Sequence, residues 1–191
     1  MRKIPPEFEN PIDNFMVVIA DQLNPFFKRT GHTPNLLTTY SLVFGLVSIY
    51  FAYQNHIGIF LILFTVSYFF DCADGNFARA YKMTSRFGDI YDHTKDLVVL
   101  ASLSFVICYK YGKCITRYNV LFIFVMMLLA GSFMGCQQRF YKQEETELLD
   151  HYKALCPNRE WISFLRYFGP GTFVFVLAFL LVYLHYFSTC K

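Results

Sequence analysis

The sequence predicts an all-α integral membrane protein, built as a bundle of five to six transmembrane helices preceded by an interfacial amphipathic helix. The chain of 191 residues is 55% hydrophobic and only 16% charged, whereas a soluble domain is about 25% charged. Its mean hydropathy is +0.34. Long apolar stretches alternate with short polar turns, and a helix needs about 20 apolar residues to cross a bilayer.

The net charge and the cysteines exclude some classes of protein. A net charge of +3 is too small to indicate a nucleic-acid partner. The six cysteines are scattered and include no CxxC pair. We therefore expect no zinc or redox motif and no disulfide, and we interpret the cysteines as small apolar helix residues. The polar N-terminus lacks a long apolar core, so we expect no cleaved signal peptide.

The first 33 residues do not span the membrane. Asn10 is a good helix cap, Pro11 fits the first helical position, and apolar residues recur on one helical face from Ile12 to Leu23. This pattern predicts a helix that lies in the membrane interface, with a plain soluble cap helix as the alternative. We expect Pro25 to end the helix. Residues 1–33 are thus predicted to be a cytoplasmic N-terminus, and residues 34–191 the transmembrane domain.

Five stretches qualify as spans, and a sixth is left open. The second stretch must extend past Asp71, because its apolar part alone is too short to cross a bilayer. Residues 137–168 are too polar for a full span, although the short amphipathic piece at 161–168 could join the last helix. The expected spans are residues 34–53, 58 to beyond 71, 87–109, 118–136 and 172–187.

The distribution of lysine and arginine predicts the orientation. Twelve of the 17 basic residues fall in segments on the N-terminal side of the membrane, and four fall on the opposite side: Lys110, Lys113, Arg117 and Lys191. We therefore expect the N-terminus and the turn that follows Ala80 to face the cytoplasm.

Residues 71–96 gather five of the 14 acidic residues of the chain: Asp71, Asp74, Asp89, Asp92 and Asp96. An aspartate at the bilayer centre costs about 2.5–3.5 kcal/mol on insertion scales, so these carboxylates must meet water or cations. Asp71 and Asp74 are spaced i, i+3 on one helical face, and Asp92 and Asp96 are spaced i, i+4 on the next helix.

A short turn would bring these two faces together, and four carboxylates would then share one space. All-oxygen ligands suit two divalent ions, Mg²⁺ or Mn²⁺, and a pair of such ions is a known device for phosphoryl chemistry. Gly75 and Ala78 leave room for a ligand, and Arg79 can pair with a phosphate. The alternatives are a solvated acidic loop and the ion or proton path of a transporter.

At these residues the sequence resembles the CDP-alcohol phosphatidyltransferase family (class I). The family signature D-x2-D-G-x2-A-R-x8-G-x3-D-x3-D is matched at every position, by Asp71, Asp74, Gly75, Ala78, Arg79, Gly88, Asp92 and Asp96. The start of the first span, residues 33–38, is also similar to a T-P-N-x2-T pattern that is common in the family.

The resemblance implies a membrane enzyme of phospholipid synthesis, with catalysis in residues 34–191. An alcohol hydroxyl would attack the phosphorus distal to cytidine in a CDP-linked donor, and CMP would leave. Asp71, Asp74, Asp92 and Asp96 would bind the metal ions, and Asp96 would also be the catalytic base. The implied CDP-binding residues are Asp71, Asp74, Gly75, Ala78, Arg79, Gly88 and Asn35.

The resemblance also implies partners and a location. The partners would be a CDP-linked lipid or alcohol, the lipid bilayer and a second copy of the chain. The active site would face the cytoplasm, in a bacterial inner membrane or an endoplasmic-reticulum-like membrane.

The acceptor is left open between two subclasses. The short chain favours CDP-diacylglycerol with a small polar alcohol, whereas the Asp92-His93 pair is common in enzymes that transfer choline or ethanolamine phosphate to diacylglycerol. Gln138, Arg139 and Lys142 could bind the acceptor or could simply anchor the helix in the membrane. A non-enzymatic, cation-binding membrane protein or transporter is the alternative from another class.

Overall fold

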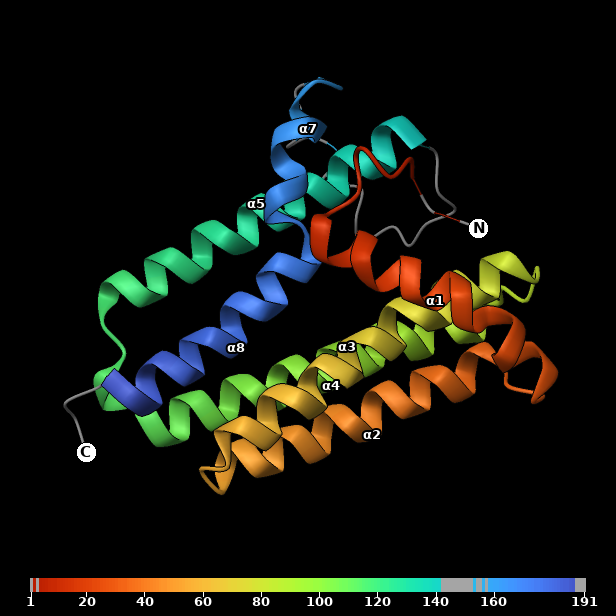
Figure 1. Cartoon of the computed structure of the whole chain (residues 1–191). Coiled ribbons are helices and arrows are strands. Elements are labelled where there is room, and N and C mark those ends of the chain that lie inside the picture. Colours follow the sequence, from red (N-terminus) through yellow and green to blue (C-terminus); the bar gives the residue numbers. More distant parts are fainter. Residues whose placement is uncertain (1, 3, 142–152, 154–155, 157, 188–191) are drawn as a thin grey trace. The chain divides into compact units, whose positions relative to one another are not determined.

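The computed structural model describes residues 2, 4–141, 153, 156 and 158–187. All regular secondary structure among these residues is helical (Figure 1), and five of the described helical segments are long and apolar enough to cross a membrane. The predicted all-α membrane fold with five spans is therefore confirmed.

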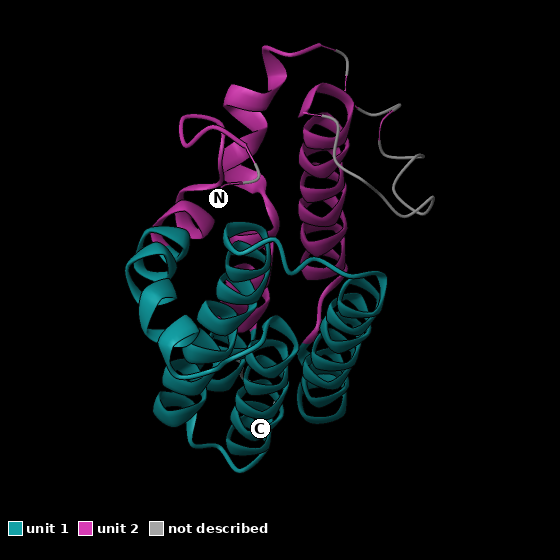
Figure 2. Ribbon diagram, turned by 90° about the vertical axis from the view of Figure 1, so that its right-hand side faces the viewer, with its two compact units in different colours: residues 1, 16–114, 181–191 teal, residues 2–15, 115–180 magenta. Residues whose placement is uncertain are grey.

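The chain forms two compact units, which Figure 2 distinguishes by colour. The first unit consists mainly of Met16–Cys114 with Leu181–Lys191, and the second of Arg2–Phe15 with Ile115–Leu180.

The first unit contains the helices that carry the aspartates: α2 (Pro34–Tyr53), α3 (Ile57–Ala80) and α4 (Arg86–Tyr111), followed by the short 3₁₀ helix η1 (Gly112–Cys114). α2 packs along both α3 and α4. A Cβ atom on Gly45 of α2 would lie only 3.0 Å from both Ser67 Oγ and a methyl carbon of Val99. A glycine at this position therefore lets the three helices approach one another closely.

Helix α1 (Pro11–Arg29) runs through Pro25 instead of ending there, so the expected helix end was wrong. A proline removes only one backbone hydrogen bond, and burial of the following turn outweighs that loss. Phe27 lies in a core cluster with Leu37 and Phe77. The helix ends at Arg29, and Gly31 follows with a φ of 75°, in the left-handed region that glycine adopts easily.

The second unit contains α5 (Arg117–Tyr141), α7 (Trp161–Leu165), the 3₁₀ helix η3 (Arg166–Phe168) and the first part of α8 (Pro170–Phe187). Asn10 caps α1 as predicted, because its Oδ1 accepts from the backbone N–H of Ile12 at 3.0 Å. The Asn10 Nδ2 donates to the Arg166 carbonyl oxygen at 2.6 Å. The amphipathic piece at 161–168 is thus a separate short helical segment before α8.

A disulfide joins Cys136 of α5 to Cys156, which contradicts the expectation that the chain has none. The two residues are 20 positions apart in the sequence, yet their Cα atoms are 5.0 Å apart. Both cysteines belong to the buried core of this unit, together with Phe133 and Ile162. Spacing along the chain could not reveal the pair, because it depends on Cys156 lying against Cys136 in the folded protein.

Candidate active site

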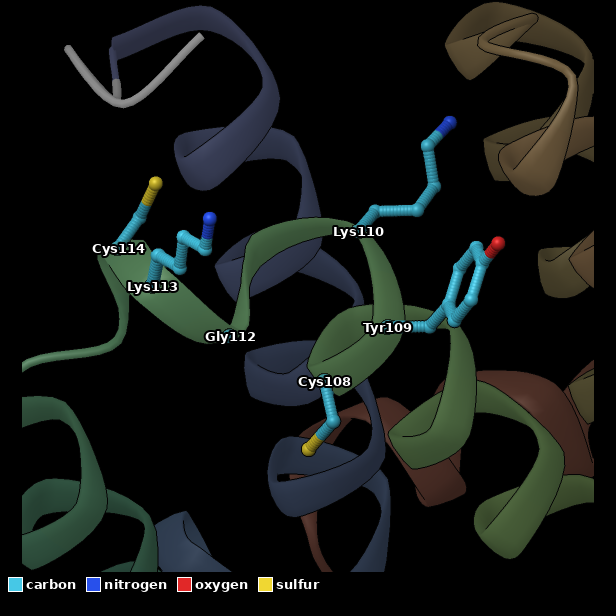
Figure 3. Close-up of a pocket in the computed structure, with 6 residues that line it drawn as sticks. All are labelled: Cys108, Tyr109, Lys110, Gly112, Lys113 and Cys114. Atoms are coloured by element: carbon cyan, nitrogen blue, oxygen red, sulfur yellow. The ribbon is translucent and has the colours of Figure 1, made fainter.

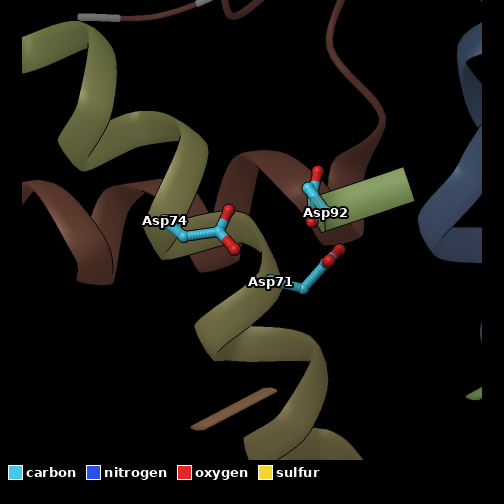
Figure 4. A group of neighbouring side chains, drawn as sticks. All are labelled: Asp71, Asp74 and Asp92. Carbon is cyan, nitrogen blue, oxygen red and sulfur yellow. The ribbon is translucent and has the colours of Figure 1, made fainter. Parts of the chain in front are cut away.

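The acidic residues lie where α3 ends and α4 begins. Ser85 caps α4, and its Oγ accepts from the backbone N–H of Gly88 at 3.0 Å. The turn between the two helices is short, so the last turns of α3 lie beside the first turns of α4. Asp71 and Asp74 come from α3 and Asp92 comes from α4, and their carboxylates point toward one another (Figure 4). The face geometry predicted from the sequence is therefore present.

Three of the four predicted metal ligands converge. One carboxylate oxygen from each of Asp71, Asp74 and Asp92 lies within 4.8 Å of the others. Asp74 is the most deeply placed, at 3% exposure, whereas Asp96 does not belong to this group of three.

These residues fit a hard divalent cation. The Oδ1 atom of Asp92 is shielded from solvent and accepts no hydrogen bond among the described residues, although the Lys95 ammonium lies 3.1 Å from it as an ion pair. A buried oxygen normally accepts a hydrogen bond or binds a cation, and this one is placed to bind a cation. Three carboxylate donors are the chemistry that Mg²⁺ and Mn²⁺ prefer. The arrangement can therefore hold a cation and, through it, a phosphate group.

Lys95 lies inside the acidic cluster, and it was not among the residues that we predicted for the site. Its ammonium contacts a carboxylate oxygen of Asp71, and it lies 2.6 Å from Asp96 Oδ1 and 3.1 Å from Asp92 Oδ1. The Lys95 side chain is 2% exposed. The signal in the sequence was its spacing, since Lys95 follows Asp92 by one helical turn and directly precedes Asp96.

Thr38 on α2 orients Asp74. The Thr38 hydroxyl donates to Asp74 Oδ2 at 2.6 Å, and both side chains are buried. The same hydroxyl lies 3.1 Å from the Pro34 carbonyl oxygen one turn earlier. Thr38 is the last residue of the T-P-N-x2-T pattern, so the sequence contained the signal but did not show which carboxylate the hydroxyl contacts.

The small residues of the motif make room for polar side chains. A Cβ atom on Gly75 would lie 3.0 Å from Nη1 of Arg79, so the guanidinium lies against the glycine backbone. A Cβ atom on Gly88 would lie 3.1 Å from Asn35 Oδ1, which brings Asn35 of α2 next to the start of α4. Ala78 is buried at 8% exposure. The predicted CDP-binding residues thus lie in the same region as the aspartates.

The predicted acceptor residues belong to the second unit. Nη1 of Arg139 donates to the Cys156 carbonyl oxygen at 2.7 Å. Gln138 is 6% exposed, and its side-chain oxygen and nitrogen have no hydrogen-bond partner among the described residues. Lys142 lies outside the described residues.

The cavity shown in Figure 3 has a volume of about 510 Å³ and lies at the other end of α4. It begins at Cys108, 16 residues after Asp92, which is about 24 Å along a helix axis. Lys110 lines the cavity, but its ammonium donates to the Tyr53 carbonyl oxygen at 2.7 Å and so caps the end of α2. None of the described residues that line this cavity carries a carboxylate, and we do not assign the chemistry to it.

Comparisons with known proteins concern most of the chain. Residues 31–189 match the sequence profile of the CDP-alcohol phosphatidyltransferases. The chain is 33% identical over 140 residues to the archaetidylinositol phosphate synthase of Pyrococcus horikoshii. That match covers 73% of this chain and 66% of the relative, so the chain spans slightly less than two thirds of the relative's length. No solved structure matches the chain significantly.

Proposed function

Because the chain belongs to the CDP-alcohol phosphatidyltransferase family, we propose that it is a membrane enzyme that transfers a phosphate-linked group from a CDP-linked donor to an alcohol hydroxyl and releases CMP. The observation that carries this proposal is the convergence of Asp71, Asp74 and Asp92 at positions of a complete family motif. Their carboxylates would hold Mg²⁺ or Mn²⁺, which supplies positive charge to the diphosphate and to the departing CMP.

Asp96 is suited to accept the proton of the attacking hydroxyl. Its side chain is 60% exposed, so an alcohol can reach it, whereas Asp74 is buried. The hydroxyl oxygen forms a bond to the phosphorus distal to cytidine, and its proton passes to Asp96. The bond between that phosphorus and the bridging oxygen breaks, and CMP leaves with the electron pair. A phosphodiester remains on the acceptor.

Arg79 and Asn35 are assigned to the CDP-linked donor. The Arg79 guanidinium lies against Gly75, the residue after Asp74, where a side chain would collide with it. A guanidinium at this position can pair with a diphosphate. Asn35 lies against Gly88 and carries both a donor and an acceptor, which suits a sugar or a base. Both residues belong to the same unit as the aspartates.

A small polar alcohol is the acceptor that we favour, with CDP-diacylglycerol or a related CDP-linked lipid as the donor. The similar protein of Pyrococcus horikoshii is an archaetidylinositol phosphate synthase, so a phosphorylated polyol is the first acceptor to test. Arg139 and Gln138 are candidates for its recognition. Arg139 keeps guanidinium N–H groups beyond the one that the Cys156 carbonyl accepts from.

The alternative hypothesis, transfer of choline or ethanolamine phosphate to diacylglycerol, gains no structural support. It rested on the Asp92-His93 pair, but the His93 side chain is 53% exposed and its Nδ1 lies 2.8 Å from the Asp89 carbonyl oxygen one turn earlier. The histidine is thus accounted for by contacts within its own helix.

We place the aspartates at the cytoplasmic face and expect a homodimer. Labelling of single cysteines tests the orientation. Thr84→Cys lies in the exposed turn before α4, and Lys113→Cys lies in exposed η1 after it. In a background that keeps only the disulfide-bonded Cys136 and Cys156, an impermeant thiol reagent added from the cytoplasmic side should label the first variant and not the second. The reverse result would overturn the proposed orientation.

A donor and acceptor panel tests the activity. The purified protein is assayed for CMP release with Mn²⁺ or Mg²⁺, using CDP-diacylglycerol, CDP-archaeol, CDP-choline and CDP-ethanolamine. The acceptors are inositol phosphate, glycerol phosphate, inositol, serine and diacylglycerol. We expect CMP release with a CDP-linked lipid and a polar acceptor. Absence of CMP with every combination would favour the non-enzymatic cation-binding alternative.

A further inference from the structure

Lys95 is positioned like a bound cation. An ammonium group has three N–H donors, and the Lys95 ammonium faces carboxylate oxygens of Asp71, Asp92 and Asp96. The side chain is 2% exposed, so water reaches it little and these carboxylates are its surroundings. Lys95 is carried by α4, the helix that also carries Asp92 and Asp96, and so its charge cannot diffuse away as an ion can.

The four carboxylates define two overlapping cation positions. The first lies among Asp71, Asp74 and Asp92, whose ligand oxygens are within 4.8 Å of one another. The second lies among Asp71, Asp92 and Asp96 and is the position of the Lys95 ammonium. Asp71 and Asp92 are common to both positions. In two-metal sites, carboxylates shared in this way hold two metal ions about 3.5–4 Å apart.

We propose that the Lys95 ammonium takes the place of the second metal ion, so that the protein binds one divalent ion per chain. This inference rests on the proposed function, which assigns the aspartates as metal ligands. It departs from the expectation of two ions that the sequence suggested. A metal ion at the second position would have to lie about 2.0–2.1 Å from the carboxylate oxygens, in the space that the ammonium fills.

The proposal gives Lys95 a role in the transfer. The ammonium lies 2.6 Å from the Oδ1 atom of Asp96, the proposed base. It therefore supplies a fixed positive charge beside the attacking oxygen, while the single metal ion acts on the diphosphate. A lysine provides this as a compact point charge.

The number of Mn²⁺ ions bound per chain tests the proposal without any turnover. The full-length protein in detergent micelles is titrated with Mn²⁺ by isothermal calorimetry, and the bound metal is examined by electron paramagnetic resonance. The parent should bind one ion with the spectrum of an isolated Mn²⁺. Lys95→Met should bind two ions and should give the spectrum of an exchange-coupled pair.

Two further variants control for charge and for folding. Lys110→Met removes a lysine from the same helix, at the end that caps α2, and it should bind one ion like the parent. Lys95→Arg keeps the positive charge and should also bind one ion. A parent that binds two ions, or none, overturns the proposal even if Lys95→Met fails to fold. A Lys95→Met protein that binds one ion overturns it as well.

These outcomes separate the inference from the proposed function. Suppose that the parent binds one ion and Lys95→Met binds two, but the parent releases no CMP. This result would contradict the transferase function and would still support the proposal that Lys95 replaces the second metal ion. CMP release by a parent that binds two ions would support the transferase function and overturn the proposal for Lys95.

Discussion

Replacing Thr38 with valine removes a single hydrogen bond from the aspartate cluster. The Thr38 hydroxyl donates to Asp74 Oδ2 at 2.6 Å, and the two side chains are 3% exposed each. Valine has nearly the same shape, so the helix packing changes little. The carboxylate of Asp74 would then lose its donor in a place that water hardly reaches, and the side chain would be free to turn away from the metal position.

The size of the effect follows from the charge on the acceptor. A hydrogen bond to a charged group contributes about 1.5–3 kcal/mol, which corresponds to a factor of about 10–100 in a binding constant. Removing a residue that orients a metal ligand typically costs about 10–100-fold in affinity. We therefore expect Thr38→Val to weaken Mn²⁺ binding by about 10–100-fold.

Calorimetric titration with Mn²⁺ measures this loss, and Thr65→Val is the matched control. The Thr65 hydroxyl donates to the Leu61 carbonyl oxygen one turn earlier at 2.8 Å, and the Thr38 hydroxyl lies at a similar position, 3.1 Å from the Pro34 carbonyl oxygen. Within the described part of the chain Thr65 makes no hydrogen bond to an aspartate, so this variant removes the helix-backbone bond alone. The reasoning would be refuted if Thr38→Val bound Mn²⁺ within twofold of the parent. It would also be refuted if Thr65→Val lost as much Mn²⁺ affinity as Thr38→Val.

Three other substitutions test separate parts of the structure. Asp96→Asn should keep Mn²⁺ binding close to that of the parent but lose at least about 100-fold in CMP release, because proton transfer to a positioned base typically contributes that much. Gly169→Ala should lower the melting temperature, since the new Cβ would lie 2.9 Å from the Phe133 ring and overpacking costs about 1–3 kcal/mol. Replacing Cys136 and Cys156 with alanine should destabilise the protein by about 3 kcal/mol, because the disulfide restricts the unfolded chain.

Each of these variants has a matched control. Asp89→Asn removes a half-exposed acid of the same helix and should leave CMP release unchanged; equal losses for Asp89→Asn and Asp96→Asn would remove the reason for choosing Asp96 as the base. Gly58→Ala adds a Cβ with nothing within 4 Å and should not lower the melting temperature. Cys108→Ala removes an exposed free cysteine, and a loss equal to that of the double variant would contradict the disulfide's role.

The sequence was sufficient for the spans and for the direction of the aspartates. Apolar length sets where a helix can cross the membrane, and the i, i+3 spacing places Asp71 and Asp74 on one face whatever the helix packs against. The need for the second span to pass Asp71 likewise followed from length alone, and α3 does extend to Ala80.

The contacts between elements could not be predicted in the same way. Spacing gives the direction of a side chain around its own helix, but not how neighbouring helices are rotated, so the partner of Thr38 was hidden. In the sequence Lys95 is one more helix charge, and only the way α3 and α4 are both packed on α2 brings it to three carboxylates. The Cys136–Cys156 pair and the continuation of α1 through Pro25 also depend on tertiary packing, which outweighs local preference.

Transfer of a labelled phosphorus tests the central claim most directly. The purified protein is supplied with Mn²⁺, inositol phosphate and a CDP-linked lipid that carries ³²P at the phosphorus distal to cytidine. We predict that the label moves into a lipid product that contains the acceptor, that unlabelled CMP appears in equal amount, and that Asp71→Ala abolishes both. Label that stays in the donor, or that is released only as hydrolysed lipid phosphate whatever acceptor from the panel is present, would contradict the account.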